Sequence, residues 1–397
     1  MQAPAVAAPG TDVVTGPGER RPRDRTPGAG VPRRPTIRDV ADLAQVSQST
    51  TSRALRNQGY VAAEVKDRVL RAATKLGYVP DEMARHLRQQ VSRSIGVLVS
   101  DLRNSFYADL AAGATRAAKR AGYTVMLMDD RLQSQDEVDA SEAFASMRVA
   151  GVVVTPLSAT VTDFLVRQHI PAVEVDRQFA PESCDAVVVD NRVAAGKLTR
   201  HLVDLGHRRI ALVVDETRWT TGRERLRGYE AALTEAGIAV DPTLQVATGW
   251  DVASARRAVA ELLARPEPPT ALFAANHLVA EGAWRAAAEL GLAIPHDLSI
   301  VSFDEMPWMT MVSPSLTTVR QDGMALGEAA VLRLLERIQA PSAPIATLVL
   351  RAEVMVRGSS GPAPWGSSRS GAGRPVLTGP PVGAGAARGG AAGDGRP

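Results

Sequence analysis

Short apolar runs alternate with helix-like segments along the chain from Ile95 onward. The runs are rich in Val, Ile and Leu with few polar interruptions, which is typical of parallel strands covered on both faces. The segments between them carry apolar residues at helical spacing. We expect strands at 95–100, 123–129, 149–156, 170–176, 186–190, 209–215, 270–275 and 298–304. The pattern predicts an α/β architecture with parallel sheets.

The alternation restarts near residue 190, which predicts two similar α/β lobes. Loops at the carboxyl ends of the strands would line a cleft between the lobes. Asp176, Asn276 and Asp304 stand at the ends of predicted strands, Arg225 begins a helix and Trp250 lies in a polar loop. Such residues suit a sugar, because a carboxylate accepts bonds from hydroxyls and an indole covers an apolar ring face. The alternative is strand-end caps, surface ion pairs and a core aromatic.

A different pattern precedes the lobes, from Thr36 to Leu87, and it predicts a small all-α module. Thr36 is a good N-cap, and Asp39 three residues later completes a capping-box pattern. Apolar residues at 37, 40, 43 and 44 share one helical face, and Val46 fills a turn. Ser47 then caps a second helix that runs from about Gln48 to Leu55. This spacing predicts a helix-turn-helix.

The exposed face of the second helix offers Gln48, Ser49, Ser52 and Arg53. Short polar groups and one arginine suit base edges in a major groove, since arginine pairs well with guanine. The alternative is an ordinary solvated face. The charge balance favours DNA, because 31–94 carries 12 basic and 6 acidic residues in a chain of net charge +3.

Both ends of the chain lack periodicity. Residues 1–34 and 358–397 are rich in Gly, Pro, Ala or Arg, and we expect them to be disordered; alternatively, translation starts downstream of the first segment. With a single cysteine, Cys184, no disulfide can close within the chain. Without a membrane-length apolar run or a secretory signal, the expected location is the cytoplasm.

Catalytic and metal sites find no support in the sequence. The stretch around Gly196 lacks the glycine spacing of a phosphate loop, and the six histidines form no zinc pattern. Cys184 has no recognisable base, and no nucleophile elbow is present. We therefore expect no enzyme activity, no metal and no cofactor.

Residues 36–87 resemble the DNA-binding headpiece of the LacI/GalR family of bacterial transcription regulators. The matching blocks are DVADLAQVSQSTTSRAL, Val61, KLGYVP and ARHL, in the family's order and spacing. The resemblance implies that Ser47 to Arg53 enter the major groove, while Thr36 and Thr50 help to hold phosphates. Ala62 departs from the usual Ser or Thr cap of the third helix, which costs about 1 kcal/mol.

The segment DEMARHLRQQ resembles the family's hinge helix. The resemblance implies that Leu87, flanked by Arg85 and Arg88, inserts as an apolar wedge into the minor groove. Alternatively or in addition, Leu87 packs against the hinge of a second chain. Asp81 replaces the usual Asn and brings an acid near phosphates.

From Ile95 to Arg357 the chain resembles the family's effector domain, which shares its fold with periplasmic sugar receptors. The blocks that carry the resemblance include DLRNSFY, IPAVEVDR, LFAANHLVAEG and SPSLTTVRQDG. The implied effector-binding residues are Asn104, Phe106, Asp176, Arg225, Trp250, Asn276, Asp304 and Gln321. His277 and Ser302 replace the usual Asp and Gly, which either changes effector preference or is tolerated.

The expected organisation has five parts. They are a disordered tail at 1–34, a helix-turn-helix domain at 35–80, a hinge helix and linker at 81–94, an effector-binding and dimerisation domain at 95–357, and a disordered tail at 358–397. Within the effector domain we expect a first lobe of 95–189 plus 321–342. The second lobe would comprise 190–320 plus 343–357.

The resemblance implies a repressor that binds pseudo-palindromic operator DNA as a homodimer, under allosteric control by a small molecule such as a sugar. The sequence leaves open the effector's identity, whether it releases DNA or promotes binding, and whether the assembly is a dimer or a tetramer. A transport receptor of the same two-lobed fold is the alternative. The headpiece and the absent signal peptide argue against it.

Overall fold

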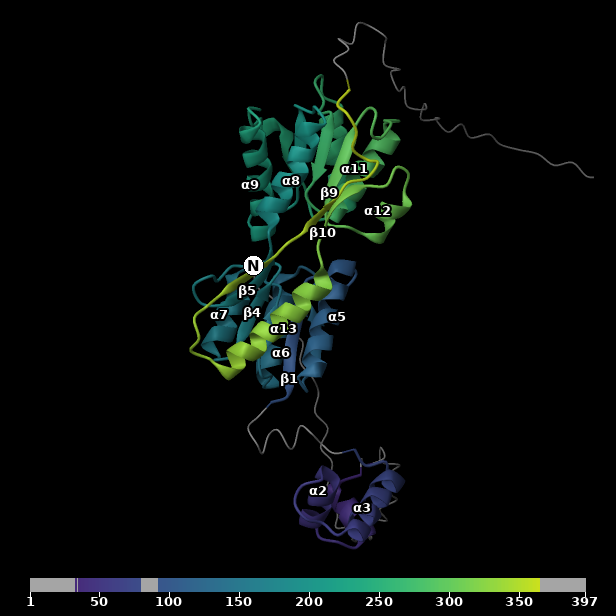
Figure 1. Cartoon of the computed structure of the whole chain (residues 1–397), viewed down its shortest axis with the longest axis vertical. Coiled ribbons are helices and arrows are strands. Elements are labelled where there is room, and N and C mark those ends of the chain that lie inside the picture. The colour runs from purple at the N-terminus through teal and green to yellow at the C-terminus, as the bar shows by residue number, and fades with distance from the viewer. Residues whose placement is uncertain (1–32, 34, 80–91, 365–397) are drawn as a thin grey trace, which may run out of the picture. The chain divides into compact units, whose positions relative to one another are not determined.

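The computed structural model describes residues 33, 35–79 and 92–364, and the chain forms two compact units, 1–90 and 91–397. The first unit is helical, and the second contains two six-stranded sheets that are almost entirely parallel (Figure 1). The predicted fold class is confirmed.

The first unit, the headpiece, packs three helices around a small apolar core. They are α1 (Ile37–Ala44), α2 (Gln48–Arg56) and α3 (Ala63–Leu76). Val40 and Val69 are fully buried at the centre of this core, with alanines around them. The predicted capping box at Thr36 and Asp39 is present, and Ala62 provides no side-chain cap for α3.

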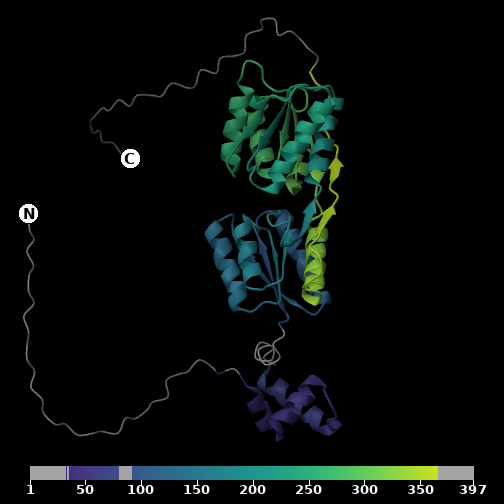
Figure 2. The ribbon, with the colours of Figure 1, turned by 90° about the vertical axis from the view of Figure 1, so that its left-hand side faces the viewer.

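The first lobe of the second unit contains a sheet in the order β11-β5-β4-β3-β1-β2. Its strands are β1 (Ser94–Val99), β2 (Thr124–Asp129), β3 (Val152–Val154), β4 (Ala172–Val175), β5 (Asp185–Val189) and β11 (Thr347–Leu350). Its helices are α5 (Ser105–Arg120), α6 (Ser134–Ser146), α7 (Ala159–Arg167) and α13 (Gly323–Gln339). Helices α5 and α13 cover one face of the sheet and α6 and α7 the other (Figure 2).

The second lobe repeats this arrangement with the order β12-β10-β9-β8-β6-β7. Its strands are β6 (Ile210–Val214), β7 (Gln245–Ala247), β8 (Ala271–Ala274), β9 (Ser299–Phe303), β10 (Thr317–Arg320) and β12 (Glu353–Met355), the last antiparallel to β10. Its helices are α8 (Asn191–Asp204), α9 (Thr220–Glu235), α10 (Val252–Leu263), α11 (His277–Glu289), α12 (Pro307–Met311) and a short 3₁₀ turn at Pro242–Leu244. Position by position in the two sheets, β9 is therefore the counterpart of β4.

The predicted lobe boundary near the carboxyl end is wrong. We expected 343–357 to belong to the second lobe, but β11 pairs with β5 in the first lobe, with Thr347 opposite Ala186. Only β12 joins the second sheet. Strand β11 is an edge strand whose residues are mostly exposed, so its apolar pattern could not reveal which sheet it joins.

The predicted start of the carboxyl-terminal tail at Gly358 is also wrong. Ser359 is fully buried, and its hydroxyl donates to the Ile300 carbonyl and accepts from the Thr317 amide. The Ala363 amide donates to the carbonyl of Leu205. These bonds attach residues 358–364 to the second lobe, although their composition is that of a loop.

Candidate DNA-binding and effector-binding sites

Helix α2 is held at its amino end by Ser47. The Thr50 amide donates to the Ser47 Oγ at 3.1 Å, and the buried Thr51 hydroxyl donates to the Ser47 carbonyl at 3.1 Å. This cap leaves Gln48, Ser49 and Arg53 exposed, while Ser52 and Thr50 are half-buried. Of the residues predicted to contact base edges, Gln48, Ser49 and Arg53 are therefore the most accessible.

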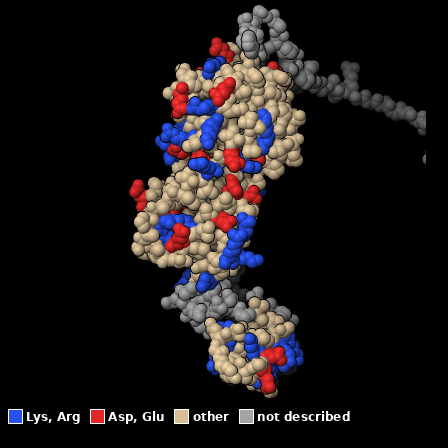
Figure 3. Space-filling view, viewed as in Figure 1, with Lys and Arg blue, Asp and Glu red and all other residues tan. Residues whose placement is uncertain are grey.

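Thr36 is engaged within the headpiece. Its hydroxyl donates to the Asp39 Oδ2 at 2.7 Å, and this bond is the main reason why the pKa of Asp39 lies below its ordinary value. The predicted phosphate contact of Thr36 would therefore add to a capping role. Figure 3 shows both basic and acidic side chains on the visible face of the headpiece.

One exposed headpiece side chain was missed by the sequence reasoning. Tyr60 follows α2 and is 92% exposed, which is unusual for a large aromatic residue. The predicted hinge contacts Arg85, Leu87 and Arg88 lie outside the described residues.

Arg225 is buried beside the carboxyl ends of β8 and β9 in the second lobe, where it contacts Ala275 and Asp304. It is 6% exposed, and its Nε donates to the Asn191 Oδ1 at 2.9 Å while Nη1 donates to the Ala275 carbonyl at 2.6 Å. The guanidinium lies 3.7 Å from the centre of the Phe303 ring, and Nη2 is 3.9 Å from the Asp304 Oδ1. The residue is thus fixed from several sides by the second lobe itself.

The Asp304 carboxylate lies beside this arginine and is also contacted by His277 and Gln321. Burial alone would raise the pKa of Asp304, but Arg225, His277 and Gln321 together hold it below its ordinary value. The Gln321 amide donates to the Asp304 Oδ1, and the His277 Nδ1 lies 3.7 Å from the Asp304 Oδ2. The structure therefore brings three sequence-selected positions together around one carboxylate.

Asp176 stands at the matching place in the first lobe, directly after β4, as Asp304 stands directly after β9. Its Oδ2 accepts a bond of 3.0 Å from the Tyr107 hydroxyl, and burial is the largest cause of its raised pKa. Both aspartates have a positive φ, 68° and 72°. Such backbone costs about 1–3 kcal/mol for a residue other than glycine and tends to occur at functional sites.

Arg177, which the sequence reasoning missed, is buried where the two lobes meet. It is 1% exposed, and its guanidinium donates to the Ser100 hydroxyl and to the Tyr107 hydroxyl, each at 3.0 Å. The available signal was its place directly after Asp176. Tyr107 was missed as well, although it adjoins the selected Phe106, with which its ring makes an edge contact.

Two tryptophans lie where the two lobes meet. Trp250, selected from the sequence, meets Trp219 edge to face at 4.8 Å between ring centroids. Trp219, which the sequence reasoning missed, lies 3.9 Å from the Arg177 guanidinium, and its Nε1 donates to the Leu157 carbonyl at 3.1 Å. Trp219 therefore connects the second lobe to the first.

Asn104 and Asn276 act as helix caps, the alternative that we considered for strand-end polar residues. The Asn104 Oδ1 accepts from the Phe106 amide at 3.0 Å, and the Asn276 Oδ1 accepts from the Val279 amide at 2.9 Å. In Asn276, however, the buried Nδ2 has no hydrogen-bond partner among the described residues. Capping therefore uses only the side-chain oxygen of Asn276, and its NH₂ group can still donate a hydrogen bond.

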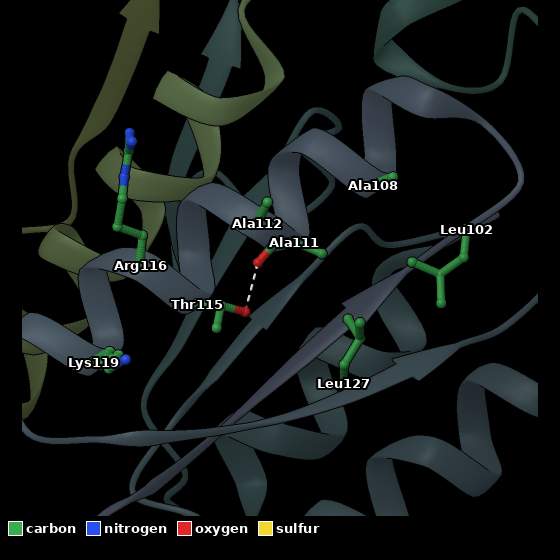
Figure 4. A pocket seen from close by; sticks show the side chains of 8 residues that line it. All are labelled: Leu102, Ala108, Ala111, Ala112, Thr115, Arg116, Lys119 and Leu127. Carbon is green, nitrogen blue, oxygen red and sulfur yellow. Dashed lines mark hydrogen bonds between the residues drawn. The ribbon is translucent and has the colours of Figure 1, made fainter.

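A separate surface groove lies on α5 and β2 of the first lobe (Figure 4). Its floor is largely apolar, and Leu102 and Leu127 at its side are both exposed. The residues that line it are Leu102, Ala108, Ala111, Ala112, Thr115, Arg116, Lys119 and Leu127. An exposed apolar surface of this kind is typical of a protein contact.

Two kinds of site are absent from the part of the chain that the structure describes. Its acidic, histidine and cysteine side chains form no group of three that could hold a metal ion. None of the described helices is both long and apolar enough to cross a membrane.

The comparisons with known proteins identify a domain of known family in each of the two compact units. Residues 36–81 match the family described as bacterial regulatory proteins, lacI family, and residues 199–360 match the periplasmic binding protein-like domain. The chain is 32% identical to the HTH-type transcriptional repressor CytR of Escherichia coli (strain K12) over 330 residues, which cover 82% of this chain and 96% of that protein.

Solved structures give the same result. A lac repressor dimer bound to operator and the anti-inducer ONPF matches with a TM-score of 0.74 and 27% identity, over 83% of this chain and 100% of that one. A complex of the transcriptional regulator CelR with cellobiose matches with a TM-score of 0.63 and 29% identity, over 82% and 100%. The chain therefore belongs to the LacI family of bacterial regulatory proteins.

Proposed function

We propose that this protein is a transcriptional repressor that binds operator DNA through α2 and is controlled by a sugar or sugar derivative in the cleft. The observation that carries the proposal is the presence, in one chain, of a capped helix-turn-helix and a cleft of buried polar residues from two lobes. Neither part alone would distinguish a regulator from a simple DNA-binding protein or a solute receptor.

In the headpiece, the proposed contacts are hydrogen bonds to base edges and electrostatic contacts to phosphates. Gln48, Ser49 and Arg53 are exposed on α2 and suit base edges, with Arg53 suited to guanine. Further contacts to the DNA phosphates and base edges would come from Ser47, Ser52, Thr50 and Thr36. For the hinge, the family resemblance supports a minor-groove role for Leu87 with Arg85 and Arg88.

At the effector end, the proposed binding residues come from both lobes. Asp176 represents the first lobe, with Asn104 and Phe106 at the start of α5. The second lobe contributes Arg225, Asn276, Asp304, Gln321 and Trp250. A ligand bound by both lobes would change their positions relative to each other. In typical allosteric proteins the coupling free energy between two binding sites, here the effector and operator sites, is about 1–3 kcal/mol.

The proposed assembly is a homodimer. The apolar groove on α5 and β2 supports this, because a second copy would cover Leu102 and Leu127, and the lac repressor relative is a dimer on operator. A two-fold dimer presents two headpieces, which matches a pseudo-palindromic operator.

The test is selection of bound duplexes from a randomised DNA library by the purified protein at near-physiological salt. We expect a palindromic consensus with a central pyrimidine–purine step, because such steps kink easily. Weak, salt-labile binding without any consensus, also in the presence of a metabolite extract, would contradict the proposal. The same duplex then serves to screen for effectors.

The alternatives are a transport receptor and an enzyme. A receptor of the same fold would need no headpiece, and it would fail the library selection. An enzyme would chemically change a ligand that binds the cleft; recovery of that ligand unchanged after incubation supports the proposed regulator.

A further inference from the structure

Trp219 stands at a position where a helix normally has a polar cap. It is the N-cap residue of α9, and its side chain makes no capping hydrogen bond. Serine, threonine, aspartate and asparagine are preferred there because they accept from the first amides of a helix. The indole instead reaches the other lobe, where its Nε1 donates to the Leu157 carbonyl at 3.1 Å. This tryptophan therefore serves the contact between the lobes and not the helix that it precedes.

The first lobe holds the partners of Trp219 in place by itself. The Leu157 amide donates to the Glu137 Oε1 of α6 at 2.7 Å. The Arg177 guanidinium, which lies 3.9 Å from the centre of the indole ring, donates to the Ser100 hydroxyl at 3.0 Å. The indole therefore lies on a surface whose order does not depend on it.

A backbone hydrogen bond joins the lobes beside the indole. The Gln178 amide of the first lobe donates to the Thr220 Oγ1 of the second at 3.1 Å. The next two amides, those of Phe179 and Ala180, donate within the first lobe to the Glu174 Oε2, at 2.8 and 3.2 Å. One amide of this turn therefore reports on the contact between the lobes, and its two neighbours report on the first lobe alone.

The chain crosses between the lobes at one edge of the two sheets. It crosses after β5, β10 and β11, which together with β12 are the first two strands in the two sheet orders. The crossings after β5 and β11 are bonded to each other, since the Asp190 amide donates to the Leu350 carbonyl and the Ala352 amide donates to the Asp190 Oδ1. Trp219 and Leu157 follow β6 and β3, the fifth and fourth strands of those orders. The indole thus lies away from the crossings, where a rotation about them separates the lobes.

We propose that Trp219 is a latch that joins the two lobes directly, and that its release lets them separate about the crossings. The contacts of the indole run from protein to protein and need no ligand. They consist of one hydrogen bond, the Arg177 guanidinium and the Trp250 ring, so they are few enough to break and reform. The latch sets the balance between joined and separated lobes on which an effector acts, because a ligand shifts an existing equilibrium.

Hydrogen–deuterium exchange of the full chain tests the latch, with exchange resolved to single amides and measured without DNA or ligand. Trp219→Ala should raise the exchange rate of the Gln178 amide at least tenfold, because the lobes then separate more often. The amides of Phe179 and Ala180 should stay within twofold of their wild-type rates, since their acceptor belongs to the same lobe.

Two further variants make the test independent of whether Trp219→Ala folds. Trp219→Phe keeps a ring near Arg177 but loses the donor to Leu157, and it should raise the Gln178 rate at least threefold. Trp284→Phe is the matched control, because Trp284 lies on α11 and packs against the core of the second lobe. It should leave the Gln178 rate unchanged.

Two exchange results would overturn the inference. One is a Gln178 rate within twofold of the wild type in every folded Trp219 variant. The other is an equal rise at Gln178, Phe179 and Ala180, which would mean that the first lobe itself has loosened.

The consequence for DNA binding rests on the proposed function and is measured on the operator found by library selection. Without effector, Trp219→Ala should change the operator Kd at least threefold, whereas Trp284→Phe should not change it. An unchanged Kd for Trp219→Ala would overturn the regulatory role of the latch. Failure of the library selection would contradict the proposed function instead, and the exchange rates, which need no DNA, would still decide whether Trp219 joins the lobes.

Discussion

At the scale of single residues, the cleft depends on two aspartates whose backbones are strained. Asp176 and Asp304 follow equivalent strands of the two sheets and both adopt a positive φ. Neither is a glycine, so each conformation must be stabilised by its surroundings, which here are Tyr107 for Asp176 and Gln321 for Asp304. The two carboxylates, one from each lobe, lie close enough to interact electrostatically.

Arg225→Ala should abolish the effector response and leave operator binding intact. The cleft loses the guanidinium that faces Asp304, whereas the headpiece has its own core in a separate compact unit. The measurement is operator affinity with and without the effector found by screening. Arg227→Ala, on the same helix but exposed and paired with Glu224, is the control and should respond normally. A normal response of Arg225→Ala would show that the cleft assignment is wrong.

Asp130→Asn should stabilise the protein at pH 8 and have little effect near pH 4. Asp130 is fully buried, and within the described part of the chain its Oδ2 has no hydrogen-bond partner. Burial is the main reason why its pKa is raised to about 7. A raised pKa favours the folded state below about pH 4, and this contribution is lost as the pH rises through 7.

Three pKa units correspond to roughly 4 kcal/mol, so a gain on the order of 2–4 kcal/mol is expected at pH 8. Denaturant unfolding at both pH values measures it. Asp163→Asn, an exposed residue on α7, is the control and should change stability little at either pH. An equal gain for Asp130→Asn at pH 4 and pH 8 would rule out ionisation as the cause.

At the scale of elements, two glycines allow α5 and α13 to pack closely. A Cβ on Gly113 would lie 2.0 Å from the Met324 carbonyl oxygen, and one on Gly327 would lie 1.9 Å from the Leu110 carbonyl oxygen. Each glycine therefore accommodates the backbone of the opposite helix. Since α13 follows β10 of the other lobe, this contact anchors one of the chain crossings between the lobes.

Gly327→Ala should destabilise the effector domain by about 1–3 kcal/mol, the usual cost of overpacking, because the obstacle is backbone and not a flexible side chain. Thermal or denaturant unfolding measures the change. Gly196→Ala on α8 is the matched control, since its Cβ would lie 3.5 Å from the nearest atom, an ordinary contact. That variant should be neutral or slightly stabilising. Equal effects of the two changes would contradict the close-packing argument.

At the scale of the whole molecule, regulation requires that an event in the second unit changes how the first unit holds DNA. The connection runs through residues 80–91, which lie outside the described residues. The family resemblance predicts that Leu87 in this connection inserts into the operator. Specific recognition would then depend on a residue that belongs to neither compact core.

Leu87→Ala should weaken specific operator binding by tenfold or more and change nonspecific binding much less. An apolar wedge acts only where the duplex kinks, whereas phosphate attraction acts on any sequence. Titrations with operator and with a scrambled duplex at the same salt concentration measure both. Leu332→Ala, an exposed leucine on α13, is the control. Equal losses on the two duplexes would exclude the wedge.

Local order was readable from the sequence by itself. Helix caps and the alternation of strands with helices depend on residues only a few positions apart. The sequence pattern therefore predicts them, as it does the capping box at Thr36 and Asp39 and the cap at Ser47. The same signals placed Asp176, Asn276 and Asp304 at strand ends. The fold class followed from these elements, whereas the family was implied by the resemblance of blocks such as DVADLAQVSQSTTSRAL.

Only the tertiary structure decided how distant residues combine. Strand β11 is exposed and could pair with either sheet, and Ser359 looks like a tail residue until Ile300 and Thr317 bind it. Arg177 and Trp219 stand 42 positions apart, and their contact exists because the two lobes face each other. Such pairings depend on chain topology and not on local periodicity, which is the physical reason why the sequence alone did not disclose them.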